Sequence, residues 1–565
     1  MTEKMPLNII VGMYCSCQKA TQLSSTNAMA GNDNTKSPSI IPHKYCVMDS
    51  FHVTEVWSVK LNGMVTFYYR LEKINLSRKS WWAPVNTPDP PADRDFTTKA
   101  VRQVCGECGQ KSPQVHTQGW ICLNSACDAF WTLNGGEVPA ELEYNPVFIN
   151  ERTKFDGFLP SYALRPELPQ PGQSAKDYSV SRASTKGIVC SNCDRCIARQ
   201  NFDYWECKTK DCGFTYRLPR EPVSAASLMG NINDSYEGHA YPEDKVRSTY
   251  IGLEVKKVGL FRSHTYRLPP SNSITHMFSN TMINKTRGGP DDLLWNLQLG
   301  ENDLRRSALK MAQVDGQLSA HFSVNYGLPY KYIVAVDSKG FNQAPPEVLE
   351  GVHRMTWAAE QAVSDNSFQK FNECLMVAYM ESEKMGYHDD GEDTLEPVVA
   401  TLSLGAPGTM RFRMKLRYFS GFSDKQRTRY DPKIPIIDGC WKPEDRRRLN
   451  DLARTGISAQ ALNDKAKRVL KCKGTPALGP AVLELRLKHG DLLVMNGADL
   501  QKYYEHEAMP MEGLRFCLTC RGIKRDMLPE DQLWKGDLPE GFDLPENQYH
   551  GDKELYEEVL RKMRA

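Results

Sequence analysis

The chain has 565 residues, of which 40% are hydrophobic and 25% are charged, and its formal net charge is +2. This composition is ordinary for a soluble globular protein, and the length allows about two to four domains. No apolar run approaches the roughly 20 residues that a membrane helix needs, and Met1–Pro6 lacks the basic start and apolar core of a secretory signal. We therefore expect an intracellular protein without membrane contact, in which the 17 cysteines serve as metal ligands rather than disulfides.

The first 50 residues are expected to be largely disordered, because residues 18–40 are rich in Ser, Thr, Asn and Gly. Residues 51–225 form a predicted β-rich region, in which residues 51–84 carry many β-branched and aromatic side chains. Within this segment, every second residue from Val65 to Leu71 is more apolar than the residues between them, which indicates the more apolar face of a strand. The more apolar set is Val65, Phe67, Tyr69 and Leu71.

A cysteine pattern occurs twice in this region, with the same spacing and a shift of 85 residues. The first copy lies within residues 105–133 and the second within residues 190–218, and each is expected to be a small module. Four thiolates in two close pairs form a closed tetrahedral site, which suits a structural Zn(II) ion. Cys196 could compete as a ligand in the second module. The predicted zinc ligands are Cys105, Cys108, Cys122 and Cys127, then Cys190, Cys193, Cys207 and Cys212.

Further along the chain, helices are predicted to begin near Asp291 and to span Glu347–Ala362, which follows two prolines. From about residue 371 short apolar strands dominate, so the region 226–525 is expected to be β-rich. The tail, residues 526–565, is charged, and Lys553–Arg564 reads as an amphipathic helix.

Two segments of this region carry candidate metal ligands. His388 and Asp390 form an H-x-D pair, and His506 follows a Gly-Asp turn and an apolar strand. Two imidazoles and one carboxylate leave three positions open on an octahedral Fe(II) ion. Arg515 and Arg521 then stand six positions apart on another apolar strand. A guanidinium there can hold the carboxylate of a 2-oxoacid through two hydrogen bonds. The H-x-D pair alone, or His506 alone, is more often a structural feature, but the order of these motifs along the chain favours an oxygenase.

In this order the parts resemble the AlkB-like family of Fe(II)/2-oxoglutarate dioxygenases, over roughly residues 318–525. The same resemblance extends to Phe322–Gly327, Phe371–Glu373, Tyr379 and Leu404–Phe412. It implies a C-terminal double-stranded β-helix (jelly roll), preceded here by the two four-cysteine zinc modules in a mixed, β-rich protein. It also implies that Fe(II) and 2-oxoglutarate are the cofactors.

The resemblance further implies roles for individual residues. His388, Asp390 and His506 match the iron ligands. Arg515 matches the partner of the distal carboxylate of 2-oxoglutarate, Tyr379 matches a hydroxyl contact to the same molecule, and Arg521 matches the second arginine of the strand. Two positions depart from the pattern, since Val377 and Cys517 stand where the family commonly has asparagines that help to hold 2-oxoglutarate. The segment that resembles the substrate-facing part of the family predicts contact with a base by Asn325, Tyr326 and Tyr330, with aromatic core packing as the alternative for the tyrosines.

Between the predicted iron ligands lies an insertion, residues 415–478. From Lys415 to Lys473 it has sixteen Lys or Arg and seven Asp or Glu, a net charge of +9. Clustered positive charge near an active site attracts phosphate backbones, and Tyr430 and Trp441 could stack on bases. The alternative is a solvated helical excursion whose charges keep it soluble.

These patterns predict an oxidative demethylase of N-methylated nucleic acid, DNA or RNA, that presents the base outside a duplex. One alternative keeps the chemistry and changes the substrate to a protein or a small molecule. Another is a zinc-ribbon protein that binds nucleic acid or chromatin and has a weak oxygenase domain. We expect a nuclear rather than a cytoplasmic location, with Arg446–Arg448 as a short basic run. The sequence gives no oligomeric state.

Overall fold

The computed structural model describes most of the chain. The described residues are 7–12, 45–61, 64–74, 94–139, 141–157, 168, 187–193, 195–217, 222–229, 244–300, 302–308, 318–329, 338–363, 368–380, 384–423, 429–470, 479–511, 513–542 and 544–564. Residues 18–40, Cys15, Cys17 and Tyr330 lie outside them. Within the first 50 residues, where we expect disorder, the structure has one short strand and the start of a second.

These residues belong to two compact units. Unit 1 comprises Met1–Leu168, Gly187–Ile197 and Cys207–Phe214, and unit 2 comprises Pro169–Lys186, Ala198–Glu206 and Thr215–Ala565. All eight predicted zinc ligands belong to unit 1, whereas two short strands within residues 190–218, Tyr204–Glu206 and Thr215–Arg217, belong to unit 2.

Unit 1 is built on an antiparallel sheet of three strands: β1 (Leu7–Gly12), β2 (Tyr45–Leu61) and β3 (Met64–Lys73). Short elements carry the two cysteine modules beside it. They are β4 (Arg102–Val104), β5 (Lys111–Pro113), β6 (Thr132–Leu133), β7 (Gly136–Glu137), α2 (Pro146–Asn150), β8 (Ile188–Val189) and β9 (Cys196–Ile197).

The more apolar face of β3 is not the face that builds the core of unit 1. Val65, Phe67 and Tyr69 are exposed, at 44%, 55% and 50%. The core lies on the other face, where Trp57 of β2 is 2% exposed and stacks on Tyr68. The polar residues on that face are accommodated by ion pairs, such as the one of 3.6 Å that joins buried Arg70 to buried Glu151. Burial of charge is tolerated when the charge is paired, and a strand pattern does not reveal such a partner.

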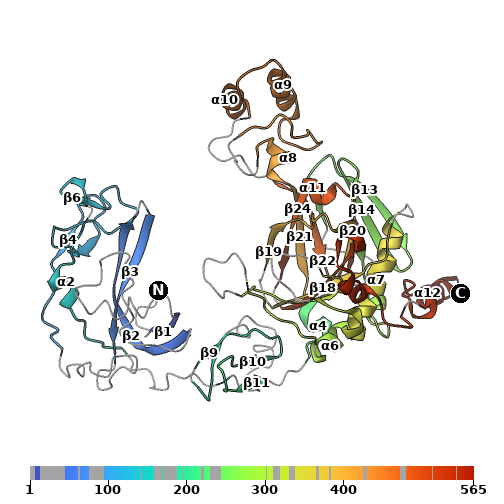
Figure 1. Cartoon of the computed structure of the whole chain (residues 1–565), viewed down its shortest axis with the longest axis horizontal. Coiled ribbons are helices and arrows are strands. Elements are labelled where there is room, and N and C mark those ends of the chain that lie inside the picture. Colours follow the sequence, from blue (N-terminus) through green and yellow to red (C-terminus); the bar gives the residue numbers. More distant parts are fainter. Residues whose placement is uncertain are drawn as a thin grey trace. The chain divides into compact units, whose positions relative to one another are not determined.

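Unit 2 contains two facing antiparallel sheets with a hydrophobic core between them (Figure 1). The large sheet has the order β13-β14-β15-β23-β20-β25-β18-β16-β17, with only β16 and β17 parallel. Its strands are β13 (Gly252–Val258), β14 (Phe261–Leu268), β15 (Asn272–Phe278), β16 (Phe322–Gly327), β17 (Ser338–Lys339), β18 (Glu373–Met380), β20 (Leu395–Gly405), β23 (Leu492–Asn496) and β25 (Leu514–Ile523).

The small sheet has the order β12-β22-β21-β24-β19. Its strands are β12 (Lys245–Val246), β19 (Met385–His388), β21 (Gly408–Met414), β22 (Ala481–Leu487) and β24 (Tyr504–Pro510). Two antiparallel sheets packed in this way form the jelly roll, so the predicted fold of this region is confirmed. A separate pair of strands, β10 (Tyr204–Glu206) and β11 (Thr215–Arg217), completes the strands of unit 2.

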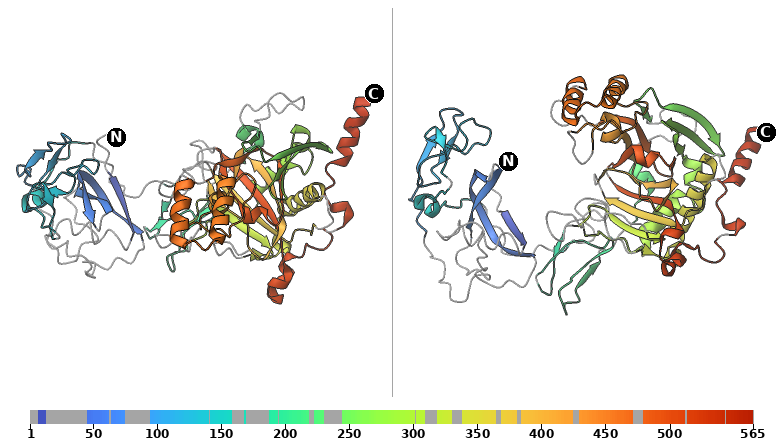
Figure 2. Two further views of the ribbon diagram at one scale, coloured as in Figure 1. Left: turned by 90° about the horizontal axis from the view of Figure 1, so that it is seen from above. Right: turned by 45° about the horizontal axis from the view of Figure 1, so that its top comes forward.

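Helices cover the outer face of the large sheet, where a second core contains Val348, Val352 and Met355 with Met376 and Leu518 (Figure 2). The predicted helices near Asp291 and over Glu347–Ala362 are confirmed as α6 and α7. The helices of unit 2 are α4 (Ala225–Met229), α5 (Thr281–Asn284), α6 (Pro290–Leu299), α7 (Pro346–Ala362), α8 (Leu416–Ser420), α9 (Pro443–Arg454), α10 (Ala459–Val469), α11 (Leu500–Tyr503) and α12 (Lys553–Arg564), with 3-10 turns at Phe341–Gln343, Arg525–Met527, Glu530–Gly536 and Pro545–Asn547. None of the described helices has the length and apolar character to cross a membrane.

A buried imidazole between two carboxylates joins both sheets to the turn before β23. His276 of β15 has no exposed surface; its Nδ1 lies 2.8 Å from Asp244 and its Nε2 3.1 Å from Asp491. Burial lowers the pKa of His276, but the two carboxylates outweigh it and raise the pKa to about 9. The ring is therefore a cation at neutral pH. Gly490, at φ +84°, precedes Asp491, and a Cβ there would collide with the side chains of Asn284 and Ser279.

We predict that His276→Gln lowers the free energy of unfolding by about 3–5 kcal/mol at pH 6, because it leaves two buried carboxylates without their cation. A raised pKa in the folded state gives stability that is present in full below the ordinary histidine pKa near 6.5 and is lost as the pH rises through about 9. The difference from wild type should therefore narrow above pH 9 in urea titrations followed by tryptophan fluorescence. His550→Gln, at an exposed histidine, is the control, and a pH-independent difference for His276→Gln would contradict a charged ring.

Candidate active site

The two sheets of unit 2 enclose one pocket that brings together most of the predicted site residues. Strands of both sheets line it. Its lining is Leu375, Val377, Tyr379, Met385, His388, Asp390, Thr401, Gly408, Thr409, Met410, Leu487, Met495, His506, Ala508, Met509, Pro510, Arg515, Cys517, Thr519 and Arg521. Polar and charged groups therefore converge in a space that is otherwise lined by aliphatic and thioether side chains.

The three predicted iron ligands lie together at the β19 edge of the small sheet. His388 of β19 and His506 of β24 are direct cross-strand partners, and their ring centroids are 4.4 Å apart. Asp390 follows β19, and its Oδ2 lies 3.9 Å from Nε2 of His506. Antiparallel pairing of β19 with β24 thus unites residues that are far apart in the sequence.

The protonation states of these groups suit a divalent metal. Burial and the neighbouring His388 lower the pKa of His506 to about 3, so its ring is neutral and can offer a lone pair. Burial alone would raise the pKa of Asp390, but Arg521 and the two histidines hold it well below its usual range. One buried carboxylate and two imidazoles are the donor set that Fe(II) takes in a facial triad, so these residues could hold the ion.

The loop that carries Asp390 is fixed from two sides. The backbone N–H of Asp390 donates to Oε1 of Gln501 in α11, at 3.0 Å. Asp389 does not line the pocket, and its Oδ2 lies 2.8 Å from Nζ of Lys415, at the base of the insertion. Gln501 and Lys415 were not predicted, because nothing in the sequence pattern links them to the H-x-D motif.

Strand β25 supplies the floor of the pocket through every second residue: Arg515, Cys517, Thr519 and Arg521. Arg515, 4% exposed, donates to the carbonyl of Ala406 and to Oγ of Ser403, at 2.9 and 2.7 Å. Tyr379 is its direct partner on β18. A buried guanidinium and a tyrosine side by side can bind the carboxylate of a 2-oxoacid, the role that the family resemblance implies for both.

The two departures from the family pattern are cross-strand partners. Val377 of β18 pairs directly with Cys517 of β25, and both line the pocket. Burial raises the pKa of the Cys517 thiol, so it stays neutral. Thr401 and Thr519, whose hydroxyls are 3.3 Å apart, lie one step further along the same face of the sheet and were missed. The alternation of β25 was the signal that could have found Thr519.

The predicted substrate contacts fare differently. Tyr326 is 1% exposed, packs in the core beneath the helices and donates its hydroxyl to the carbonyl of Asn302. This position matches the aromatic-packing alternative and not contact with a base, because successive residues of a strand face opposite sides of the sheet. Asn325 is also buried and donates to the carbonyl of Leu328 and to Oγ of Ser338, and it does not line the pocket. Tyr330 lies outside the described residues.

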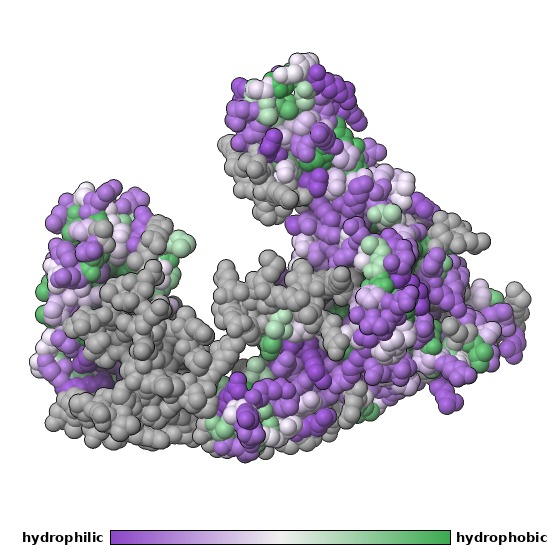
Figure 3. Space-filling view, in the orientation of Figure 1, coloured by the Kyte–Doolittle hydropathy of each residue, from purple (hydrophilic) through white to green (hydrophobic). Residues whose placement is uncertain are grey.

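The insertion forms a small helical body that stands beyond the sheets (Figures 1 and 2). Its own core includes Phe422, Leu449 and Leu462, and Tyr430 is buried in it rather than available for stacking. Trp441 is 44% exposed. The surface of this body is mostly hydrophilic with apolar spots (Figure 3).

Part of the positive charge of the insertion is buried or paired within it. Arg446 has no exposed surface and donates to the carbonyls of Tyr418, Ile434 and Pro435. Along the helices three ion pairs recur at a spacing of three residues: Arg447 with Glu444, Arg448 with Asp445 and Arg454 with Asp451. The basic run Arg446–Arg448 is thus partly a structural element. Lys465, Lys467 and Arg468 extend the positive charge along the last turns of α10.

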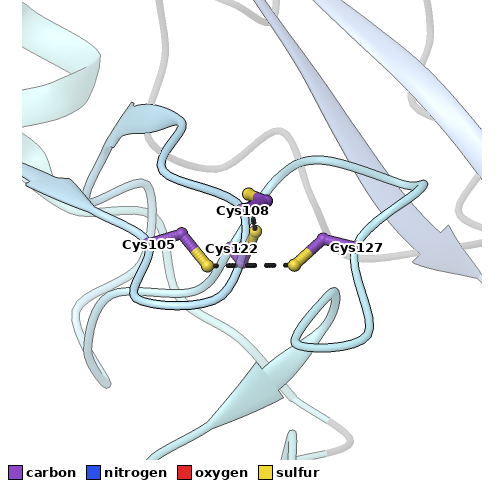
Figure 4. Close-up of side chains that lie close together, drawn as sticks. All are labelled: Cys105, Cys108, Cys122 and Cys127. Carbon is purple, nitrogen blue, oxygen red and sulfur yellow. Dashed lines mark hydrogen bonds between the residues drawn. The ribbon is translucent and has the colours of Figure 1, made fainter.

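The first cysteine module gathers four sulfur atoms. Ligand atoms of Cys105, Cys108, Cys122 and Cys127 lie within 4.8 Å of one another, and two pairs of Sγ atoms are 3.8 Å apart (Figure 4). Four sulfurs bound to zinc at ~2.3 Å with tetrahedral angles would be about 3.8 Å apart. The geometry therefore fits a structural zinc ion.

The second module repeats this arrangement. Its cluster is Cys190, Cys193, Cys207 and Cys212, with two Sγ pairs 3.5 Å apart. Cys196, the competing thiol, is not part of the cluster. A closed set of four sulfurs leaves no position for a substrate, so this module also fits a structural role.

Comparison with known proteins identifies the domain that holds the pocket. A family model described as the 2OG-Fe(II) oxygenase superfamily matches residues 299–521, which contain His388, Asp390, His506, Arg515 and Arg521. The chain carries a 2OG-Fe(II) oxygenase domain. It is a 2-oxoglutarate-dependent dioxygenase, and the predicted resemblance is confirmed at the level of the superfamily.

Among solved structures, the oxygenase is similar to OsALKBH1 with 14% sequence identity, over 44% of this chain and 97% of that chain. The TM-score is 0.22, so this likeness carries no argument about fold or substrate. No curated protein matches the chain in sequence.

For the second zinc module we predict that Cys193→Ser removes one zinc ion per chain, because a thiolate of the cluster is lost. Cys196→Ser should keep the full zinc content, since Cys196 lies outside the cluster. Inductively coupled plasma mass spectrometry of the purified variants measures both. Loss of zinc on Cys196→Ser and not on Cys193→Ser would reverse the assignment.

For the oxygenase domain we predict that Arg515→Gln raises the KM for 2-oxoglutarate roughly 100-fold, about 2.7 kcal/mol, because the two-pronged contact with a carboxylate is lost. Succinate formation at varied 2-oxoglutarate gives the KM. Arg413→Gln is the matched control, because Arg413 contacts Glu505 and Tyr387 and does not line the pocket. An unchanged KM in Arg515→Gln would show that the carboxylate binds elsewhere.

Proposed function

We propose that the protein is an AlkB-like demethylase that oxidises N-methyl groups of nucleic acid. The observation that carries the proposal is the convergence of His388, Asp390 and His506 with Arg515 and Tyr379 in one pocket of an oxygenase domain. When bound, Fe(II) and 2-oxoglutarate would supply the activation of O2. The methyl group, 2-oxoglutarate and O2 would become a hydroxymethyl group, succinate and CO2, and the hydroxymethyl group would then leave as formaldehyde.

The residues of the chain would prepare this reaction by position and charge. His388, Asp390 and His506 would hold the iron on one side and leave the other side to the pocket. Arg515 and Tyr379 would orient 2-oxoglutarate through its distal carboxylate. The aliphatic and thioether lining, which includes Met385 and Met410, would exclude water from the reacting methyl group.

The positive charge of the insertion supports nucleic acid as the substrate, because exposed cations attract phosphates. The pocket lies between two sheets, so a base would have to enter it from a single strand or by flipping out of a duplex. The burial of Arg446 and Tyr430 favours a second candidate, the same chemistry on a protein or small-molecule substrate, because it removes a cation and an aromatic ring from the surface that could meet nucleic acid. The complete set of iron ligands and Arg515 speak against a zinc-module binding protein with a weak oxygenase domain.

The test is succinate and formaldehyde release by zinc-replete, Fe(II)-loaded protein with a panel of N-methylated oligonucleotides. We predict that one modified base stimulates both products in equal amounts and that His388→Ala abolishes them. His550→Ala, an exposed histidine outside the pocket, should behave as wild type.

A second variant separates the candidate substrates. Replacement of Lys465, Lys467 and Arg468 by glutamine should weaken stimulation by oligonucleotides and flatten its dependence on salt, while basal succinate formation stays unchanged. Basal succinate that ignores every oligonucleotide would favour the protein or small-molecule substrate. Absence of succinate despite bound iron would favour the zinc-module binding protein.

A further inference from the structure

Behind the candidate iron site lies a buried carboxyl group that no part of the proposed reaction uses. Glu373, the first residue of β18, has no exposed surface. Its direct partners are Gly327 on β16 and Arg521 on β25. Gly327 has φ +87°, and a Cβ there would press on the backbone of Asn372 and Glu373. The close approach of β16 thus fixes where the Glu373 side chain begins.

A single guanidinium joins this carboxyl to the site. Arg521 donates from one terminal nitrogen to Oε2 of Glu373, at 3.3 Å, and from the other to Oδ1 of Asp390, at 2.9 Å. All three side chains are at most 5% exposed. Since the guanidinium is planar, its two terminal nitrogens point in fixed directions, and a partner on one constrains the orientation of the other.

We propose that Glu373 is a positioning residue that sets the orientation of Arg521 and, through it, of the metal-binding carboxylate of Asp390. The inference rests on the iron site of the proposed function. Asp390 accepts from Arg521 through Oδ1, whereas its Oδ2 is the oxygen near His506, on the side where the two residues would share a metal. If Arg521 had no anchor at Glu373, it could rotate about its contact with Asp390, and the carboxylate would lose its preferred direction.

The charge balance agrees with an anchoring role. Burial raises the pKa of Glu373 to about 8, although Arg521 beside it acts in the opposite direction. At neutral pH the group is therefore mainly a neutral acceptor of a hydrogen bond and draws little positive charge away from Asp390. Partners of metal ligands that act in this way change metal affinity by roughly 10–100-fold when they are removed.

The simpler explanation is that Glu373 only accepts a hydrogen bond from a buried arginine and so serves stability. The two explanations differ in metal affinity. A purely stabilising contact would change the unfolding temperature when it is removed and leave the affinity of the folded protein for metal unchanged. A positioning contact changes the affinity in protein that is still folded.

The experiment measures Mn(II) binding by electron paramagnetic resonance in zinc-replete protein, without O2 or turnover. Glu373→Met keeps a similar volume and replaces the carboxyl oxygens by a thioether, which is only a weak acceptor, so we expect its dissociation constant for Mn(II) to rise roughly 10–100-fold. Glu373→Gln keeps an acceptor oxygen and should bind within about threefold of wild type, since second-layer effects arise from the hydrogen bond. Circular dichroism confirms that each variant is folded.

Glu151→Met is the matched control. Glu151 is also a buried carboxylate beside an arginine, 3.6 Å from Arg70, but it belongs to unit 1. The Glu151→Met substitution should lower the free energy of unfolding and leave Mn(II) binding unchanged. Folded Glu373→Met that binds Mn(II) as wild type does would overturn the inference. If Glu373→Met does not fold, the folded Glu373→Gln and Glu373→Ala variants decide. Equal weakening of Mn(II) binding in both would indicate a charge effect and overturn the inference. Weakening of Mn(II) binding in Glu373→Ala alone would support the inference. If the His388→Ala variant bound Mn(II) as tightly as wild type does, this result would overturn the iron site itself.

Discussion

Strand β25 lies between β18 and β20, and antiparallel hydrogen bonding along both of its edges determines the geometry of the pocket. Because alternate residues of a strand face the same side, one register places Arg515, Cys517, Thr519 and Arg521 in a row on the floor. The same register brings Tyr379 beside the first arginine and Glu373 beside the last. A slip by one residue would turn all four side chains away from the pocket.

The row has two ends with different tasks. At one end Arg515 is held by Ala406 and Ser403 and is ready to meet an anion. At the other end Arg521 is already shared by two carboxyl groups of the protein. Two arginines six positions apart, alike in the sequence, therefore meet different partners: a carbonyl and a hydroxyl oxygen at Arg515, and two carboxyl groups at Arg521. The difference arises from what the neighbouring strands present to each.

The sequence was sufficient for the parts that depend on local pattern. The spacing of the cysteines, the H-x-D motif, His506 and the two arginines after it predicted two clusters and one pocket, and the geometry brings these residues together. It was insufficient where a tertiary partner decides. Tyr326 and Asn325 occupy adjacent positions of β16 in the same motif, yet the fold buries both: Tyr326 in the core beneath the helices, and Asn325 through its hydrogen bonds to Leu328 and Ser338. Likewise the apolar face of β3 is exposed because Arg70 and Glu72 on the other face find charged partners from distant segments. The net charge of the insertion also overstated its free cations, since Arg446 turned inward.

The direct pairing of Val377 with Cys517 has a consequence for chemical selectivity. Each side chain replaces an amide that the family commonly has, and because they are neighbours the two replacements form one patch without amide groups in the lining of the pocket. A 2-oxoacid analogue with a small hydrocarbon group directed there would gain about 25 cal/mol for each Å2 of apolar surface buried. In a relative with two asparagines the same hydrocarbon group would displace water from the amides without replacing its hydrogen bonds, which would weaken binding. The patch formed by Val377 and Cys517 is therefore a place where an inhibitor could distinguish this oxygenase from a relative with two asparagines.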